Sequence, residues 1–388
     1  MLTDCYPPAV GGIEAHVYGL AAQIAQQGIA VDVITHRRHA SGPLRAAEEA
    51  VDVSLPGSRV FRIGGQPVHW GAVHNVVNFR LQQEVGALLH AGNYDVVHSH
   101  SLGCLVGWAG LPVARQMGLP TVITKHSMVL ERRWRPISRA LLRLDRWMAR
   151  RWADQLIAVS RAGADELAGF GLPVETIPNG VDCDHWRPDG QLRGQTRKRL
   201  GFGPDDVVVG YLSRLVPAKD PLAMVNLAER LRHSAPAVKI LVVGDGPLRS
   251  ALESRIAGAG LAAQFCLVGA VPWQETPELY NAMDVFAFPS RTEAFGLVLA
   301  EAMACGVPPV ARSSGGAREI VMDGETGYLV GSEDEFQRRV VELVADGALR
   351  ERLGQAARRR VVERYDWSVA AARTAEVYGA LARRKELA

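Results

Sequence analysis

The sequence predicts an α/β protein built from two doubly wound, Rossmann-like domains. Its 388 residues are more than one hydrophobic core usually serves. Short apolar runs alternate with longer amphipathic patterns along almost the whole chain, as in repeated β-α units. Most of these runs are apolar throughout, which is typical of strands in a parallel sheet whose two faces are covered by helices.

The expected elements divide into two sets of similar size. Strands are predicted in the first half at residues 31–35, 95–98, 121–124, 155–159 and 174–178. In the second half they are predicted at residues 207–212, 238–243, 265–268, 285–288 and 307–311. The polar stretch 187–204, rich in Gly and Arg, is the expected linker. We therefore expect domains at residues 1–190 and 191–366, with a C-terminal helix, 367–388, crossing back to the first domain.

The first strand departs from this pattern. Only Met1–Asp4 precede a turn at Tyr6-Pro7-Pro8, although a doubly wound domain normally opens with a full apolar strand. Two interpretations stay open, a very short first strand or a true start upstream of Met1, and the second is favoured.

Composition and charge narrow the function class. A net charge of +3 does not by itself argue for nucleic acid binding. The five cysteines are scattered without C-x-x-C spacing, which indicates a reducing compartment. No apolar run reaches the ~18 residues of a membrane span, and no signal peptide opens the chain. We expect a cytoplasmic protein, or one on the inner face of a membrane.

Residues 131–151 carry eight Arg and two acidic residues around an apolar stripe. Such a helix can lie on anionic lipid, or it can pack in the fold with a solvated Arg face. Peripheral membrane contact is therefore an open expectation.

Two cations follow the predicted strand 207–212. Arg214 and Lys219 flank a turn at its carboxyl end, where open α/β sheets bind their ligands. They can clamp a diphosphate, or form a solvated basic loop. Gly246, in the turn Gly244-Asp245-Gly246-Pro247, can line a nucleotide pocket or simply connect a strand to a helix.

Two carboxylates follow the predicted strand 285–288. Seven residues separate Glu293 from Glu301, which would place both on one face of a helix. Small apolar residues flank Glu301, and a carboxylate in such surroundings usually has a partner or ligand, for example ribose hydroxyls. Gly296 and Leu297 would supply backbone N–H groups near the helix start. The alternative is an ordinary charged helix.

The first half offers glycines and histidines. Gly11 and Gly12 open a helix after the first strand and can let a backbone approach a ligand, or form a tight turn. His126, like His98 and His100, ends a predicted strand. Two interpretations are open for these residues: a hydrogen bond to a sugar, or a structural capping role. No histidine or cysteine set has zinc spacing, and Asp182-Cys183-Asp184 is interpreted as a turn. We expect no metal.

Together these pieces resemble family 4 of the retaining glycosyltransferases, which have the GT-B fold of two Rossmann-like domains facing across a cleft. The resemblance covers nearly the whole chain. It rests on Pro7-Pro8, Gly11 to Glu14, His126, Ile177 to Asp182, Ser213-Arg214, Lys219, Gly244 to Pro247, and Glu293 through Glu301. The stretches around Glu14, His98 and His126 look closest to the catalytic subunit of the glycosylphosphatidylinositol N-acetylglucosaminyltransferase.

The resemblance implies a role for each site residue. Arg214 and Lys219 would hold the donor diphosphate, Glu301 the ribose, and Glu293 the transferred sugar. Gly296 and Leu297 would donate N–H groups near the phosphate. Gly12 would lie beneath the diphosphate, and His126 would hydrogen-bond the sugar.

The implied reaction is metal-independent transfer of a hexose or N-acetylhexosamine, with retention of configuration. UDP-N-acetylglucosamine is the first choice of donor, and an inositol-like, lipid or small-molecule hydroxyl is the acceptor. No cofactor beyond the nucleotide sugar is expected. The alternatives are a nucleotide-sugar 2-epimerase of the same fold, a catalytically silent subunit, and a regulator that binds nucleotide sugars.

Overall fold

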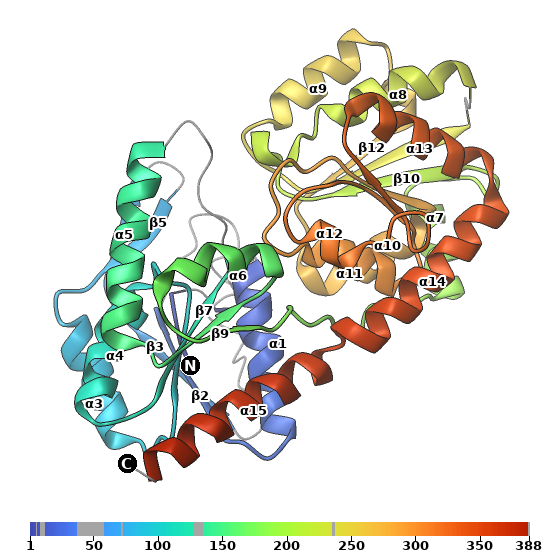
Figure 1. Cartoon of the computed structure of the whole chain (residues 1–388). Helices are drawn as coiled ribbons and strands as arrows, with labels where there is room; N and C mark the ends of the chain where they lie inside the picture. Colours follow the sequence, from blue (N-terminus) through green and yellow to red (C-terminus); the bar gives the residue numbers. More distant parts are fainter. Residues whose placement is uncertain are drawn as a thin grey trace. The chain divides into compact units, whose positions relative to one another are not determined.

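The computed structural model describes residues 1–4, 6–7, 12–36, 58–70, 73–126, 135–234 and 237–386. The chain forms two compact units (Figure 1). Unit 1 comprises Met1–Gly180 with Trp367–Ala388, and unit 2 comprises Val181–Asp366. Each unit is a parallel sheet with helices, so the prediction of two Rossmann-like α/β domains is confirmed. In the described part of the chain, no helix is both long and apolar enough to cross a membrane.

Unit 1 contains a seven-stranded parallel sheet in the order β3-β2-β1-β6-β7-β8-β9. Its strands are β1 (Leu2–Thr3), β2 (Val31–His36), β3 (Ser58–Ile63), β6 (Val97–His100), β7 (Thr121–Lys125), β8 (Gln155–Ala158) and β9 (Val174–Thr176). Its helices are α1 (Gly12–Gln26), α3 (Leu81–Ala91), α4 (Leu105–Gln116), α5 (Arg135–Trp152), α6 (Arg161–Leu167) and α15 (Trp367–Glu386). An antiparallel hairpin, β4 (Gln66–Trp70) with β5 (Val73–Val77), accompanies the sheet.

The short strand β1 lies in the middle of this sheet. Leu2 is in register with Ile34 of β2 on one side and with Ser99 of β6 on the other. The chain runs outward from β1 to β3 and then returns across β1 to β6. Asp4 directly follows β1, and its carboxylate accepts hydrogen bonds from the Leu105 and Val106 N–H groups at the start of α4.

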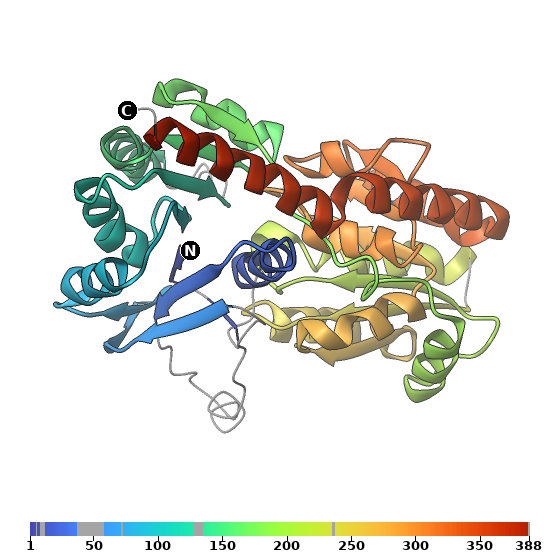
Figure 2. The ribbon, with the colours of Figure 1, turned by 90° about the horizontal axis from the view of Figure 1, so that it is seen from below.

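The C-terminal helix α15 belongs to unit 1, where it packs against α1 (Figures 1 and 2). The Trp367 ring, at its start, fits against two glycines. A Cβ atom at Gly19 would lie 2.4 Å from this ring, and one at Gly180 would lie 2.3 Å from it. Further along α15, the Tyr378 hydroxyl is 2.6 Å from His98 Nδ1. The last helix is therefore part of the core of unit 1.

Unit 2 contains a six-stranded parallel sheet in the order β12-β11-β10-β13-β14-β15. Its strands are β10 (Val207–Leu212), β11 (Val238–Val243), β12 (Phe265–Gly269), β13 (Val285–Phe288), β14 (Pro309–Arg312) and β15 (Tyr328–Val330). Its helices are α7 (Gly190–Arg199), α8 (Ala223–Ser234), α9 (Arg249–Gly258), α10 (Thr276–Ala282), α11 (Leu297–Ala304), α12 (Ala317–Ile320), α13 (Glu333–Ala345) and α14 (Gly347–Tyr365).

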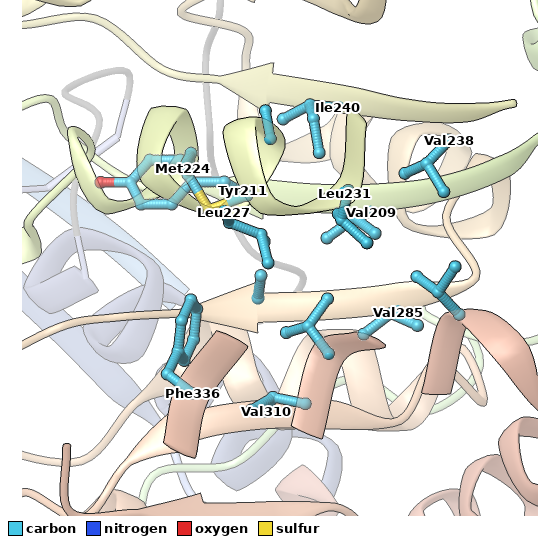
Figure 3. Packing of buried hydrophobic residues seen from close by; sticks show 14 of the residues in the cluster. Val209, Tyr211, Met224, Leu227, Leu231, Val238, Ile240, Val285, Val310 and Phe336 are labelled. Carbon is cyan, nitrogen blue, oxygen red and sulfur yellow. The ribbon is translucent and has the colours of Figure 1, made fainter. Parts of the chain in front are cut away.

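Both faces of this sheet are buried. Val209 and Tyr211 of β10 point to one face, where they pack with residues of α8 and α13 such as Met224 and Phe336 (Figure 3). Val208, which points to the opposite face, is also fully buried. Burial of both faces is the reason that the strands read as continuous apolar runs in the sequence.

The expected linker at residues 187–204 is wrong, because this stretch contains helix α7. Asp189 caps the helix by accepting a hydrogen bond from the Leu192 N–H group. Arg193 and Arg197 then pair with Asp284, at 2.6 and 3.1 Å. The arginines that make this stretch polar thus form ion pairs within unit 2. The chain passes between the units at Gly180–Val181 and Asp366–Trp367, and not at residue 190.

Other differences concern strand ends and missed strands. The sixth strand begins at Val97, two residues after its predicted start at Asp95, and β14 begins at Pro309 where residue 307 was predicted. The edge strands β3 and β15 and the hairpin were not predicted. Edge strands are short or partly polar, so their apolar pattern is weaker.

Two helical glycines in unit 2 offer a test of the packing between α11 and α14. A Cβ atom at the buried Gly354 of α14 would lie 2.1 Å from the carbonyl oxygen of Gly306, whereas one at Gly194 of α7 would meet nothing within 4 Å. We predict that Gly354→Ala lowers the free energy of unfolding by about 1 to 3 kcal/mol, because backbone must move. Gly194→Ala should raise it by up to about 1 kcal/mol.

Urea unfolding followed by circular dichroism measures both changes. Equal stability of the two variants would contradict the tight approach of α14 to the Cys305–Gly306 turn.

Candidate active site

The strand order of unit 2 reverses between β10 and β13. The chain runs from β10 outward to β12, and then crosses back to β13 and outward to β15. Open parallel sheets bind ligands outside the carboxyl ends of the strands at such a reversal. Arg214 and Lys219 follow β10, and Glu293 follows β13, so three predicted residues lie on the two loops at this point.

Lys219 and Glu293 form an ion pair between the two loops. Lys219 Nζ lies 2.5 Å from Glu293 Oε2, and the two side chains are 18% and 14% exposed. Lys219 Nζ also lies 5.5 Å from the centre of the Phe288 ring. An ammonium group at a strand reversal, partly shielded from water, is suited to bind an anion more strongly than a fully solvated lysine would.

A second ion pair, which the sequence analysis missed, anchors the Lys219 turn. Asp220 has a left-handed backbone with φ 49°, and its Oδ2 atom accepts hydrogen bonds from Arg291 Nε and Nη2 at 3.0 and 2.8 Å. The Arg291 N–H group donates to the Ala218 carbonyl at 2.9 Å. The loop after β10 is thereby fastened to the loop after β13 on both sides of Lys219.

Glu293 does not lie on a helix, which corrects the prediction of one helical face for Glu293 and Glu301. Helix α11 begins only at Leu297, because Gly296 has a left-handed φ of 107°. Glu293 belongs to the preceding loop, where its carbonyl accepts a hydrogen bond from the Gly316 N–H group at 3.0 Å. The two carboxylates thus come from different elements.

Glu301 lies in the middle of α11, and its carboxylate has a hydrogen-bond partner, as expected for a carboxylate among apolar residues. Its Oε2 atom accepts a hydrogen bond of 2.8 Å from the Tyr280 hydroxyl. Burial raises the pKa of the Glu301 carboxyl to about 7, although the Tyr280 hydrogen bond acts in the opposite direction. The second carboxylate oxygen, Oε1, makes no hydrogen bond to the residues that the structure describes, so it can accept one from a ligand.

The glycine turn after β11 shapes the Arg214 loop. Gly244 and Gly246 have φ values of 130° and 155°. A Cβ atom at Gly244 would lie 2.0 Å from the Ser213 carbonyl oxygen, and one at Gly246 would lie 2.7 Å from that of Leu215. Arg214, between these two carbonyls, has an exposed side chain without an ion pair among the described residues. Gly246 therefore has at least a structural role.

Unit 1 has its own carboxyl edge, where the structure places His126. This residue directly follows β7, and its Nε2 atom lies 3.2 Å from Nδ1 of His100, the last residue of β6. Gly12 is the first residue of α1 and is exposed. Gly11 lies outside the described residues. His98 points elsewhere, with Nδ1 on Tyr378 and Nε2 on Thr124, so it holds α15 in place.

His16 of α1 joins this edge although the sequence analysis did not select it. Its ring lies 4.4 Å from that of His126 and 5.4 Å from that of His100. Burial lowers the pKa of all three residues, that of His126 to about 3, so the rings are neutral at pH 7. A single histidine inside an apolar helical stripe gives no signal of this convergence.

Known families and relatives match both units. The family described as Glycosyltransferase Family 4 matches residues 10–185, and the family described as Glycosyl transferases group 1 matches residues 193–360. The GDP-mannose-dependent alpha-(1-6)-phosphatidylinositol monomannoside mannosyltransferase of Mycolicibacterium smegmatis is 30% identical over 97% of each chain. The D-inositol 3-phosphate glycosyltransferase of Xylanimonas cellulosilytica is 31% identical over 97% of this chain and 93% of that one.

Solved structures share the fold at lower identity. The Anabaena protein HepE in complex with UDP and glucose covers 98% of this chain and 99% of its own, with a TM-score of 0.79 and 24% identity. The sucrose-phosphate synthase of Thermosynechococcus elongatus gives a TM-score of 0.80 at 24% identity, with 98% of each chain covered. These comparisons do not support the narrower resemblance to the glycosylphosphatidylinositol N-acetylglucosaminyltransferase subunit. They show that the chain is a glycosyltransferase of the GT-B fold and belongs to the family described by glycosyltransferase family 4 and glycosyl transferases group 1.

Proposed function

We propose that this enzyme transfers a sugar from a nucleoside-diphosphate sugar to a hydroxyl group of an inositol-bearing acceptor, with retention of configuration. The observation that carries the donor half is the pairing of Lys219 with Glu293 at the strand reversal of unit 2. The acceptor half rests on the names of two relatives, one acting on a phosphatidylinositol mannoside and one on D-inositol 3-phosphate.

Two donors have separate support. The sequence resemblance favours UDP-N-acetylglucosamine, whereas the mannosyltransferase of Mycolicibacterium smegmatis is named as dependent on GDP-mannose. Both donors present the same diphosphate to Arg214 and Lys219. They differ in base and sugar, so they are the first pair to compare.

The proposed chemistry is departure of the nucleoside diphosphate from the anomeric carbon. The bond from this carbon to the phosphate oxygen breaks and the bond to the acceptor oxygen forms. The acceptor proton passes to the leaving phosphate. Negative charge grows on that phosphate, and a preorganised donor at such a site contributes ~3–4 kcal/mol. Attack on the face from which the phosphate leaves gives retention without a carboxylate nucleophile, unlike retaining glycosidases.

The remaining roles in this proposal are those that the sequence resemblance implies. Arg214 and Lys219 stabilise the phosphate charge, so the reaction needs no metal ion. The Gly296 and Leu297 N–H groups, at the positive end of the α11 dipole, support them. Glu301 accepts from the ribose with its free Oε1 atom, and Glu293 contacts the sugar. For unit 1, the roles of His126 toward the sugar and of Gly12 toward the diphosphate are those that the sequence resemblance implies.

The helix α5 supports a further proposal, that unit 1 contacts the inner face of a membrane. Met148 and Ala149 are buried in unit 1, whereas Trp147 is 56% and Leu144 37% exposed. The neighbouring Arg143 and Arg151 are exposed and make no ion pair with the residues that the structure describes. Exposed apolar side chains framed by arginines are suited to anionic lipid.

The transfer reaction is tested with purified protein, a panel of nucleotide sugars, and inositol phosphate or phosphatidylinositol as acceptor. We expect the glycosylated inositol product with one donor. Lys219→Ala should lower kcat about 100-fold or more, because phosphate charge is left unstabilised. Lys198→Ala, on the exposed face of α7, is the matched control and should leave kcat unchanged.

Near-normal turnover by Lys219→Ala would overturn its role. Release of an epimerised free UDP-sugar without acceptor would favour the 2-epimerase.

Glu301→Gln tests the raised pKa of Glu301. Since burial raises this pKa from 4.5 to about 7, the folded state binds the proton more tightly than the unfolded state. Wild-type stability should therefore fall as pH rises from about 5 to 7, and level off above that range. The glutamine of the variant stays neutral at every pH. The difference in free energy of unfolding, variant minus wild type, should therefore be larger at pH 8 than at pH 5, by on the order of 1 to 3 kcal/mol.

Melting temperatures across this pH range measure the difference. A constant difference between variant and wild type would show that Glu301 titrates normally. The donor KM of the variant should also rise if Glu301 holds the ribose.

The proposal for α5 is tested by sedimentation with lipid vesicles. Wild-type protein should bind vesicles that contain phosphatidylglycerol and dissociate from them at high salt. It should not bind vesicles of pure phosphatidylcholine. Trp147→Ser should weaken binding about tenfold, since a buried aromatic ring contributes one to a few kcal/mol. Ile29→Ser, an exposed apolar residue outside α5, serves as control, and equal loss in both variants contradicts the assignment to α5.

A further inference from the structure

Three histidines of unit 1 converge from three different elements. His16 comes from α1, His100 ends β6, and His126 follows β7. One ring nitrogen from each residue lies within 4.8 Å of the corresponding nitrogens of the other two. These residues are far apart in the sequence, so no motif of fixed spacing predicts that they meet.

Three buried nitrogens of this cluster make no hydrogen bond to the described residues, whereas His100 Nδ1 and His126 Nε2 lie within hydrogen-bond distance of each other. The side chains of His16 and His100 are 4% and 1% exposed. Both nitrogens of His16, and Nε2 of His100, make no hydrogen bond to the residues that the structure describes. The Asn179 side chain acts to raise the pKa of His16, against the larger effect of burial, and its Oδ1 atom makes no hydrogen bond to the described residues. Buried polar atoms in this state normally have a ligand or a bound water.

The surroundings keep the rings neutral and in place. His98 packs against His100 with ring centres 4.2 Å apart, and is itself held by Tyr378 and Thr124. Trp367 packs on His16 at 5.3 Å. Burial is the main cause that lowers the pKa of these rings, the neighbouring histidines act in the same direction, and the N-terminal amino group adds to this effect at His98 and His100. Among the described residues, no carboxylate pairs with the three rings. A neutral imidazole has one nitrogen lone pair, so each of the three residues can offer one ligand atom.

We propose that His16, His100 and His126 form a binding site for a zinc-type transition metal ion. Neutral imidazole is a preferred ligand of Zn²⁺, and three histidines leave a fourth position for water. Tetrahedral coordination with bonds of about 2.0 to 2.1 Å separates two ligand nitrogens by about 3.3 Å. His100 Nδ1 and His126 Nε2 are 3.2 Å apart in the structure. The absence of carboxylates from this set disfavours Mg²⁺ and Ca²⁺, which take oxygen ligands.

Occupation of this site has a consequence for the enzyme. The sequence resemblance assigns His126 to the transferred sugar, and the His126 Nε2 atom, which faces the cluster, cannot hydrogen-bond a hydroxyl while it is bound to zinc. Zinc should therefore compete with the donor sugar and inhibit transfer. This consequence rests on the proposed function, whereas metal binding does not.

Binding is tested on the untagged full chain after removal of metal by a chelator. Zinc chloride is titrated against a chromophoric chelator, and we expect one zinc ion per chain, undisturbed by excess magnesium chloride. His16→Ala and His100→Ala should each weaken binding at least tenfold. His90→Ala, an exposed histidine on α3, is the matched control and should bind as wild type.

A thermal melt of each variant establishes that it folds, and His16→Gln replaces His16→Ala if the latter does not. Zinc binding that is absent in the wild type, or unchanged in both His16 and His100 variants, would overturn the site.

Inhibition is a separate measurement. Micromolar zinc should lower the transfer rate of wild-type enzyme, with relief by EDTA and by higher donor concentration. Stoichiometric binding without inhibition would retain the site and refute its competition with the sugar. Failure of every donor to react would refute the proposed function, and the binding measurement would still decide on the site.

Discussion

A parallel sheet places the carboxyl ends of all its strands on one edge, and both units of this protein are organised by that constraint. In unit 2 the strand order reverses between β10 and β13, and the loops after these two strands meet at the reversal, where ion pairs join them. In unit 2, every predicted donor-binding residue except Glu301 belongs to a loop at this edge or to the turn that opens α11. The strand topology therefore sets where the candidate binding loops of unit 2 lie.

Within that edge, charge pairing and glycine geometry fix the details. Lys219 meets Glu293 from the neighbouring loop, and Asp220 meets Arg291 beside it. The two pairs hold the loops together, so the loops need little further ordering when a ligand binds. Gly296, with its left-handed backbone, ends the loop of Glu293 and starts the helix of Glu301. One glycine therefore separates two carboxylates that the sequence analysis predicted to lie on a single helix.

The carboxyl edge of the sheet in unit 1 carries different side chains from that of unit 2. Cations and carboxylates dominate the edge of unit 2, whereas neutral histidines gather in unit 1 around β6, β7 and α1. The C-terminal helix α15 contributes to this cluster through Trp367 and Tyr378. Because the end of the chain helps to enclose residues near its beginning, the histidine cluster exists only when unit 1 is fully assembled.

The sequence alone determined the α/β class, the two parallel sheets and most strand positions, because strands buried on both faces of a sheet are continuous apolar runs in the sequence. It also located Arg214, Lys219 and His126 at strand ends, since this placement depends on local order only. It misjudged α7 as a linker, because the partner that explains Arg193 and Arg197 is Asp284, far along the chain. The Asp220–Arg291 pair, the Tyr280–Glu301 hydrogen bond and the meeting of His16 with His100 and His126 were decided by tertiary structure. Each of these contacts joins residues from separate elements, and only the packing of the sheets brings such residues together.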